Sequence, residues 1–212
     1  MTIRTEREPS MRLVEFALGP LETNCFLLHD EQEAVIIDVG GDPSPMLTYL
    51  RKNKLALSRI LLTHLHFDHV LGVAALQEAT KAEAYCSPRD WGLLEGQNLS
   101  GYIPSVRLFR HSDLDEGKLQ LLGEDCRVLA TPGHSPGSLS YYVPSLQALF
   151  GGDVLFYNSI GRTDFEGGNS AVLSRSIREK FYTLPGDTKV YTGHGQTTSI
   201  QWEKSTNPFV QA

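Results

Sequence analysis

The sequence predicts an α/β fold in which helices cover mixed β-sheets. Short apolar or alternating runs, each bounded by turn residues, indicate strands. Longer runs with apolar residues three and four apart indicate helices, and the order of strands followed by a helix occurs twice. Layer packing permits two sheets face to face with helices outside, a four-layer αββα sandwich. The 212 residues contain no linker or low-complexity run, so we expect one domain over residues 1–212.

The first half of the chain contains five expected strands and two expected helices. Residues 13–18, 25–28 and 34–37 are apolar or alternating runs separated by Gly19-Pro20 and by a polar turn, and they indicate three strands. A helix is expected over residues 44–53, because Pro45 suits a first turn and Leu47 and Leu50 share one face. A strand at 60–63, a helix at 70–80 and a short strand at 84–86 follow.

Residues 88–117 are less regular, and two interpretations of them stay open. Trp91, Tyr102, Ile103 and Phe109 are scattered through a sequence that contains Gly and Ser. The segment is either a flap that faces the substrate or a surface excursion that packs its aromatic side chains on the core. Strands are expected after it at 118–122, 127–130, 139–143, 148–150 and 189–191, and helices at 171–182 and 200–204.

The composition excludes several classes of partner. The net charge is -6, and Lys and Arg form no cluster, so a nucleic-acid substrate is not expected and a small molecule is. The chain has an odd number of cysteines, and they are widely spaced, as in proteins of a reducing compartment: Cys25, Cys86 and Cys126. Residues 1–8 are polar and unlike a signal peptide, and no apolar run has membrane-spanning length. We therefore predict a cytoplasmic protein without a membrane partner.

Four potential metal ligands are crowded into one turn between a strand and a helix. They are His64, His66, Asp68 and His69. Imidazole and carboxylate groups bind zinc, iron or manganese at neutral pH. A single histidine is usually a surface or core residue, but four such groups together would be poorly solvated without a cation.

Three more potential ligands follow apolar runs and lie in turns rich in Gly or Pro. These are His134, Asp153 and His194. Glycine permits tight turns with positive φ and leaves space beside a site. Seven potential ligands in four turns favour two metal ions over one.

The chain resembles the hydrolases of the metallo-β-lactamase fold. The resemblance rests on the H-x-H-x-D-H spacing of residues 64–69, followed by His134, Asp153 and His194. Within that superfamily the chain looks most like the short, single-domain members of the glyoxalase II-like (hydroxyacylglutathione hydrolase) branch, because of residues 159–165, 190–198 and 207–209. The resemblance extends from about Met11 to Phe209, and it implies the αββα sandwich, with a metal site at one edge.

The resemblance also implies a ligand set and a reaction. One metal is assigned to His64, His66 and His134, the other to Asp68, His69 and His194, and Asp153 is assigned to both. Zinc is expected, with iron or manganese as alternatives. A hydroxide bridging the metals would attack a hydroxyacyl thioester such as S-lactoylglutathione, and Asp68 would also orient this nucleophile.

Substrate contacts are expected from Arg162, Asn158 and Ser159. Arg162 either contacts an anionic substrate group or holds its loop through Asp164. Because 18 residues follow His194, we expect no C-terminal helical domain of the kind that helps typical glyoxalase II enzymes bind glutathione. A persulfide dioxygenase-like enzyme with a single iron and a lactonase-type hydrolase are the alternative functions, since persulfide dioxygenases carry a similar Gly-Arg-Thr-Asp stretch.

Overall fold

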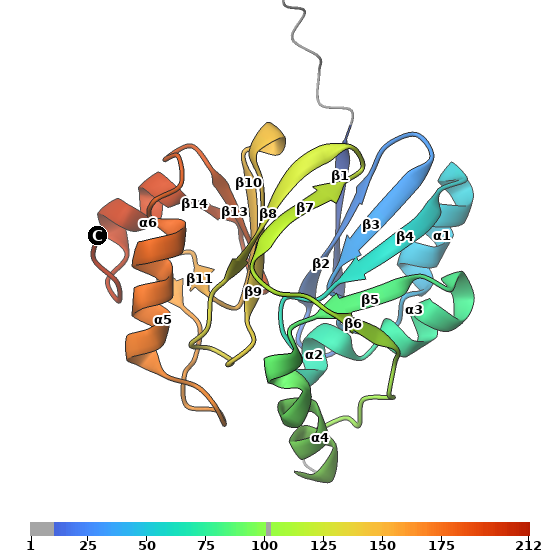
Figure 1. The fold of residues 1–212 in the computed structure, drawn as a ribbon, viewed down its shortest axis with the longest axis horizontal. Coiled ribbons are helices and arrows are strands. Elements are labelled where there is room, and N and C mark those ends of the chain that lie inside the picture. Colours follow the sequence, from blue (N-terminus) through green and yellow to red (C-terminus); the bar gives the residue numbers. More distant parts are fainter. Residues whose placement is uncertain (1–10, 101–102) are drawn as a thin grey trace, which may run out of the picture.

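Two six-stranded sheets face each other in the computed structural model, which describes residues 11–100 and 103–212 (Figure 1). Helices cover the outer face of each sheet, so the four-layer αββα sandwich is confirmed. The polar residues 1–8 and Tyr102 lie outside the described residues. In the described part of the chain no helix has the length and apolar character needed to cross a membrane.

The first sheet is antiparallel at one edge and parallel at the other. Its strands follow the chain order and are β1 (Arg12–Leu18), β2 (Thr23–His29), β3 (Glu33–Ile37), β4 (Ala56–Leu61), β5 (Glu83–Cys86) and β6 (His111–Asp113). Strands β1 to β3 pair antiparallel, and β3 to β6 pair parallel.

The second sheet is mostly antiparallel, with one parallel pair. Its strands, in spatial order, are β14 (Thr198–Ser199), β13 (Lys189–Thr192), β10 (Ala148–Gly152), β9 (Leu139–Val143), β8 (Glu124–Ala130) and β7 (Gly117–Leu121). Because β10 and β13 are parallel neighbours, the residues that follow them lie at the same edge of the sheet. A small hairpin of β11 (Leu155–Phe156) and β12 (Ser159–Ile160) follows β10.

The helices divide into two sets according to the sheet that they cover. The first sheet is covered by α1 (Ser44–Asn53), α2 (Phe67–Val70), α3 (Val73–Thr80), and η1 (Pro88–Asp90) with α4 (Trp91–Ser100). The second is covered by α5 (Ser170–Ser176), its π-helical continuation η3 (Ile177–Phe181) and α6 (Ile200–Thr206), while η2 (Pro144–Leu146) connects β9 to β10.

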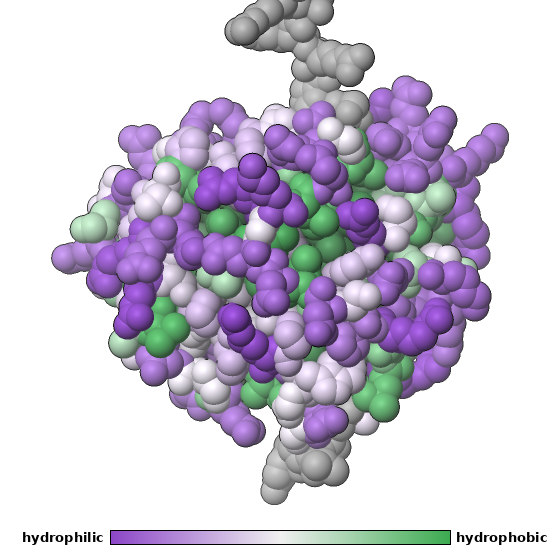
Figure 2. All heavy atoms as spheres, in the orientation of Figure 1, coloured by the Kyte–Doolittle hydropathy of each residue, from purple (hydrophilic) through white to green (hydrophobic). Residues whose placement is uncertain are grey.

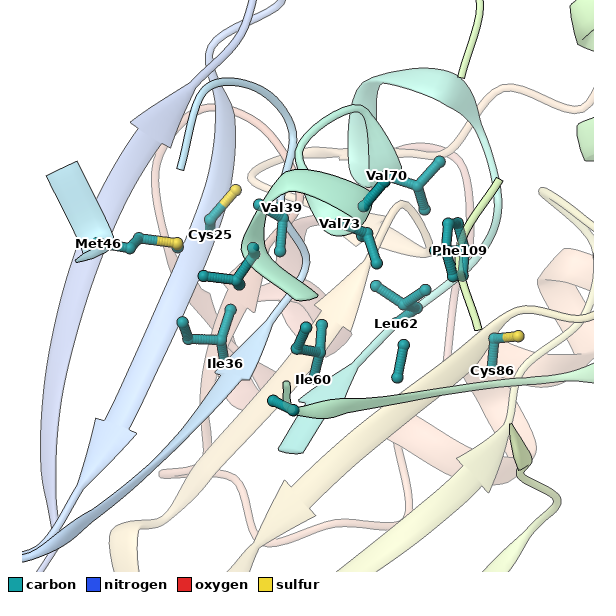
Figure 3. Close-up of a cluster of buried hydrophobic side chains, with 14 of the residues drawn as sticks. Cys25, Ile36, Val39, Met46, Ile60, Leu62, Val70, Val73, Cys86 and Phe109 are labelled. Atoms are coloured by element: carbon teal, nitrogen blue, oxygen red, sulfur yellow. The ribbon is translucent and has the colours of Figure 1, made fainter. Parts of the chain in front are cut away.

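Side chains along each strand alternate between two cores, one between the sheet and its helices and one between the two sheets. On β2, Cys25 and Leu27 face the helices, whereas Phe26 and Leu28 face the other sheet. Figure 3 shows the outer core of the first sheet, where side chains of α1 and α3 meet those of β2, β3 and β4. Between the sheets, the ring of Phe26 lies 5.1 Å from that of Phe150. The face of the molecule seen in Figure 2, which has the orientation of Figure 1, is mostly hydrophilic, with hydrophobic side chains visible near its centre.

Two expected helices differ from the structure in instructive ways. Residues 70–80 are divided between α2, which ends at Val70, and α3, which begins at Val73. Between them, Gly72 packs so closely on Gly41 that a Cβ atom would lie 1.9 Å from the carbonyl oxygen of Gly41. The helix expected over 171–182 begins with an Asn169 cap, whose side chain accepts from the N–H of Val172 at 3.0 Å, and it changes to π-helical geometry at Ile177.

Residues 88–117 contain features of both interpretations. Instead of an irregular segment, they form η1, the helix α4 and the edge strand β6. Trp91 packs edge-on against Phe109, with ring centroids 6.0 Å apart, and Phe109 is buried. Leu93 and Ile103 instead line the cavity described below, so this segment both packs on the core and faces that cavity.

The three cysteines are unpaired and buried. Burial raises the pKa of each thiol to about 12, so all three are protonated at neutral pH. The three cysteines are therefore core thiols.

Candidate metal centre

All seven predicted ligands converge where the two sheets meet at one edge. His64 and His66 lie in the turn after β4, and Asp68 and His69 are in α2. The other three come from the second sheet: His134 from the turn between β8 and β9, Asp153 from the end of β10, and His194 from the end of β13. Residues far apart in the sequence therefore form one cluster, whose members fall into three groups with donor atoms within 4.8 Å of one another.

Two of these groups correspond to the two predicted ligand triads. In the first, His64, His66 and His134 come together, and Nδ1 of His66 lies 2.8 Å from Nε2 of His134. In the second, Oδ2 of Asp68 lies 3.1 Å from Nε2 of His194 and 3.7 Å from Nε2 of His69.

Asp153 lies between the two triads and contacts both. Its Oδ2 atom is 3.6 Å from Nε2 of His134, in the first triad, and 3.6 Å from Nε2 of His194, in the second. Its Oδ1 atom is 3.4 Å from Nε2 of His69. One carboxylate is thus positioned to share its two oxygens between two neighbouring cations.

The cluster fits a metal because three of its inward-facing atoms lack hydrogen-bond partners. Nε2 of His64, Nε2 of His69 and Oδ1 of Asp153 are buried and form no hydrogen bond. Buried polar atoms in proteins are nearly always hydrogen-bonded, and unpaired ones are costly. Nitrogen and carboxylate donors that face one another satisfy this need by binding a divalent cation.

The other ring nitrogen of four histidines is held by a hydrogen-bond partner. Such partners orient a metal-binding imidazole and fix which nitrogen faces the metal. For each of these four rings Nδ1 is the atom that is held, so Nε2 is left for the centre. The Nδ1 distances are 3.0 Å from His64 to Oγ1 of Thr63, 2.8 Å from His69 to Oδ2 of Asp38, 2.8 Å from His134 to the carbonyl oxygen of Arg162, and 3.2 Å from His194 to that of Leu21.

The two triads differ in electrostatic character. Burial, and after it the charges of neighbouring histidines, lowers the pKa of His64 well below its usual value and that of His66 to about 4. Burial would also lower the pKa of His69, but the carboxylates of Asp153 and Asp38 raise it well above its usual value. Burial opposes charge on Asp153 too, yet the nearby histidines, His69 above all, lower its pKa. His64 and His66 of the first triad are therefore neutral at pH 7, whereas the second triad is an ion-paired network.

Asp38 is a functional residue that the sequence analysis did not identify. It closes β3 with a φ of 58° and is buried. Its carboxylate accepts from the backbone N–H of Thr63 at 2.8 Å and from Oγ1 of Thr63 at 2.7 Å, beside its contact with His69. The only sequence signal is an acidic residue at the end of an apolar strand before Gly40-Gly41.

Asp90 in η1 is a second buried carboxylate outside the predicted set. Its oxygens accept from the N–H of Leu65, between His64 and His66, at 3.3 Å and from Oγ of Ser135, next to His134, at 2.7 Å. The N–H of Gly137 donates to it as well. Asp90 therefore connects the two loops that supply the first triad.

Glycine is required beside the cluster because the backbone approaches it closely. A Cβ atom on Gly193 would lie 2.1 Å from Oδ1 of Asp153 and 2.8 Å from Cε1 of His69. Gly152 has a φ of 54°, and a Cβ atom there would lie 2.7 Å from the side chain of Thr63. These positions explain the glycine-rich turns noted in the sequence.

A cavity of about 830 Å³ opens onto the cluster. Of the residues expected to contact substrate, Arg162 and Ser159 line it. Asn158 does not: its Oδ1 accepts hydrogen bonds from Nε1 of Trp202 at 3.0 Å and Oγ1 of Thr206 at 3.2 Å, on the side of α6. Arg162 forms the expected contact with Asp164 through two hydrogen bonds of 2.9 and 2.7 Å, and its guanidinium lies 4.3 Å from the ring centre of Phe165.

The sandwich and the cluster of imidazole and carboxylate groups at its edge define a metal-binding protein of the metallo-hydrolase class. A family model of the metallo-beta-lactamase superfamily matches residues 18–194, and the chain belongs to this superfamily. The match extends from the end of β1 to His194, the last of the seven clustered residues.

Relatives cover nearly the whole chain. A probable metallo-hydrolase from Bacillus subtilis, YqgX, is 35% identical over 206 residues, which are 94% of this chain and 98% of the relative. The hydroxyacylglutathione hydrolase GloC of Haemophilus influenzae is 35% identical over 203 residues, 90% of this chain and 94% of GloC. The predicted resemblance to this superfamily and to its hydroxyacylglutathione hydrolase branch is thereby confirmed.

Two solved structures are similar over their full length. The B3 metallo-beta-lactamase BLEG-1 has a TM-score of 0.87 and 38% identity, covering 95% of this chain and 100% of its own. TTHA1623, solved in a di-iron-bound form, has a TM-score of 0.82 and 39% identity, covering 93% of this chain and 100% of its own.

Proposed function

We propose that this protein is a metal-dependent thioesterase that hydrolyses hydroxyacyl thioesters. The observation that carries the proposal is the Asp153 carboxylate, which faces both ligand triads at the base of an open cavity. The similarity to GloC, which is named a hydroxyacylglutathione hydrolase, supports the choice of a thioester.

The proposed cofactor is a pair of divalent cations. His64, His66 and His134 would hold one, Asp68, His69 and His194 the other, and Asp153 would contact both. Two such cations supply Lewis acidity and lower the pKa of bound water toward neutrality. We expect zinc; the di-iron form of TTHA1623 supports iron as the alternative.

The reaction consumes one water molecule. An oxygen–carbon bond forms at the acyl carbon, the carbon–sulfur bond breaks, and a carboxylic acid and a thiol are released. Asp68 takes part as a carboxylate: burial opposes its charge, but the hydrogen bond from His194 and the nearby His69 lower its pKa overall. Asp68 lines the cavity, and its carboxylate can accept a hydrogen bond from the attacking water and so orient it.

Substrate is held by the cavity wall in this proposal. Arg162 and Ser159 are retained as substrate contacts because both line the cavity. Asn158 is assigned a supporting role instead: its side chain links the β11–β12 turn to α6 through Trp202 and Thr206.

Hydrolysis of a cyclic acyl bond is the second candidate function. The same site would open a lactone or a β-lactam by water attack on the ring carbonyl. The similarity to BLEG-1, a B3 metallo-beta-lactamase at 38% identity, supports this candidate.

The proposal is tested with protein of known metal content. Lactoyl thioesters of glutathione and of N-acetylcysteamine should be hydrolysed by protein that holds about two metal ions per chain. Hydrolysis of a lactone and of a β-lactam, and oxygen uptake with glutathione persulfide, are assayed in parallel.

Asp153→Ala should reduce turnover at least 100-fold, whereas the exposed Asp125→Ala should not change it. Full activity in Asp153→Ala would refute the binuclear site, and oxygen uptake with a single iron and negligible hydrolysis would identify a dioxygenase.

A further inference from the structure

We infer that the substrate carries a bulky apolar group on its acyl or thiol half, and that this group, rather than the charged body of glutathione, fills the cavity. The inference rests on the proposed thioesterase function. It names the substrate class that the cavity wall selects.

Apolar side chains from separate elements surround the cavity. Leu93 and Ile103 come from α4 and the segment after it, and Phe156 and Ile160 come from the β11–β12 hairpin. Leu21 and Phe165, which also line the cavity, are 52% and 43% exposed. Large apolar side chains left in contact with water beside a cavity are stabilised when an apolar ligand covers them.

The apolar wall reaches the metal cluster from two sides. The ring of Phe165 lies 5.3 Å from that of His66 and 6.1 Å from that of His134. On the other side, the ring of Phe156 lies 6.4 Å from that of His194. A group attached to either side of a thioester that reacts at the cluster would therefore meet an aromatic ring.

The charges around the cavity do not suit glutathione. Among the described residues that line it, Arg162 is the single Lys or Arg, and its guanidinium is already engaged with Asp164 and Phe165. Glu166 lines the cavity as well. Glutathione has two carboxylates and one ammonium group, so its carboxylates would compete with Asp164 for Arg162 and would face Glu166.

The size of the cavity also favours a substrate with a bulky apolar group. Its volume of about 830 Å³ is in the range of sites that enclose drug-sized ligands. A lactoyl group fills little of it, so most of the wall must be covered by the rest of the substrate. A wall of this composition favours an aryl or branched alkyl group.

The test compares three thioesters that differ in one half at a time. S-mandeloylglutathione replaces the methyl group of S-lactoylglutathione by a phenyl group, and the lactoyl thioester of benzyl mercaptan replaces glutathione by an apolar thiol that carries a phenyl ring. We expect kcat/KM to rise roughly tenfold or more for at least one of the two apolar substrates, as for a large apolar group that enters a hydrophobic pocket. A gain with the mandeloyl substrate places the acyl half on the wall, and a gain with the benzyl substrate places the thiol half there. Equal or faster turnover of S-lactoylglutathione would overturn the inference.

A charge introduced into the wall gives a second readout. Leu93→Lys should shift the kcat/KM ratio several-fold toward S-lactoylglutathione, because the new ammonium group would pair with a glutathione carboxylate. The matched control is Leu108→Lys, at a position that is 70% exposed and outside this cavity. An unchanged ratio in Leu93→Lys, with the metal content unaffected, would count against the inference.

Failure of the proposed function is distinguishable from failure of this inference. If metal-loaded protein hydrolyses none of the three thioesters, the thioesterase proposal is wrong. Binding then decides the inference, by calorimetry with N-acetyl-S-benzylcysteamine and with S-methylglutathione. Binding of the benzyl thioether at least tenfold more tightly supports an apolar ligand, and equal or weaker binding refutes it.

Discussion

Oδ2 of Asp38 lies 2.8 Å from Nδ1 of His69, and both side chains are buried. The same carboxylate accepts two hydrogen bonds from Thr63, the residue just before His64. Asp38 thus orients one histidine of the second triad and anchors the chain that leads into the first. Its carboxylate therefore supports both groups of candidate ligands.

Replacing Asp38 should weaken metal binding without unfolding the protein. In Asp38→Asn an amide N–H₂ group would face at least one donor, from Thr63 or His69, so His69 would lose its fixed orientation. We expect metal affinity to fall by about 10- to 100-fold, as for other residues that support a metal ligand. Competition with a chromophoric chelator measures this, with the exposed Asp125→Asn as control. Unchanged affinity would show that His69 does not depend on Asp38.

Asp90→Asn should affect both stability and metal content. The variant leaves one buried donor among Leu65, Ser135 and Gly137 without an acceptor, which destabilises a protein by about 1–3 kcal/mol. The loops that carry His64, His66 and His134 would also lose their common anchor, so we expect the metal content to fall. Urea denaturation and metal analysis check this, with the exposed Asp187→Asn as control. A variant that matches the control in both measurements would exclude an anchoring role.

Gly193→Ala should disrupt the metal cluster without removing a ligand. The added methyl group would displace the Asp153 carboxylate or the His69 ring, because its Cβ atom would lie 2.1 Å from the first and 2.8 Å from the second. We expect loss of at least one metal ion per chain and at least a tenfold loss of hydrolysis. Gly117→Ala is the matched control, since a Cβ atom there would meet nothing within 4 Å. Normal metal content in Gly193→Ala would mean that the backbone can move away from the cluster.

The histidines of the metal-free protein should differ in protonation at pH 6.5. The pKa of His66 is lowered to about 4 by burial first, and that of His64 is lowered well below its usual value, so both rings should be neutral. The pKa of His69 is raised by Asp153 and Asp38 against the effect of burial, so this ring should be a cation. A cation must then displace a proton from His69, and metal affinity should increase as the pH rises. Nitrogen chemical shifts of the imidazoles measure each state; a neutral His69 at pH 6.5 would contradict this assignment.

The clustering of the seven candidate ligands could be predicted from sequence because much of their signal is local. Four of them lie within six consecutive positions, at His64, His66, Asp68 and His69. This dense pattern made the later His134, Asp153 and His194 recognisable as candidate ligands. Asp38 and Asp90 carry no such pattern. Their importance comes from contacts with residues 25 or more positions away, which only the tertiary structure brings together.

The elements show the same difference between local and tertiary signals. Helix α1 has its expected bounds, because Pro45 in the first turn and buried Met46 and Leu50 on one face are local features. Helix α4 was not expected, since Gly92 and Gly96 weaken its helical propensity. Tertiary contacts stabilise it instead: Leu94 is buried, and Gln97 accepts from the N–H of Phe67 and donates to the carbonyl oxygen of Leu65. The single domain over residues 1–212, the cytoplasmic location and the small-molecule partner remain predictions.

The seven clustered residues are divided between the two sheets. Four follow strand β4 of the first sheet, in the turn and in α2, and three follow strands of the second sheet. A cation bound by both sets would therefore act as a cross-link, and its binding free energy would add to the free energy of unfolding. The amount of folded protein in a cell would then depend on metal supply: under metal starvation, the chain would lose resistance to proteolysis together with its activity.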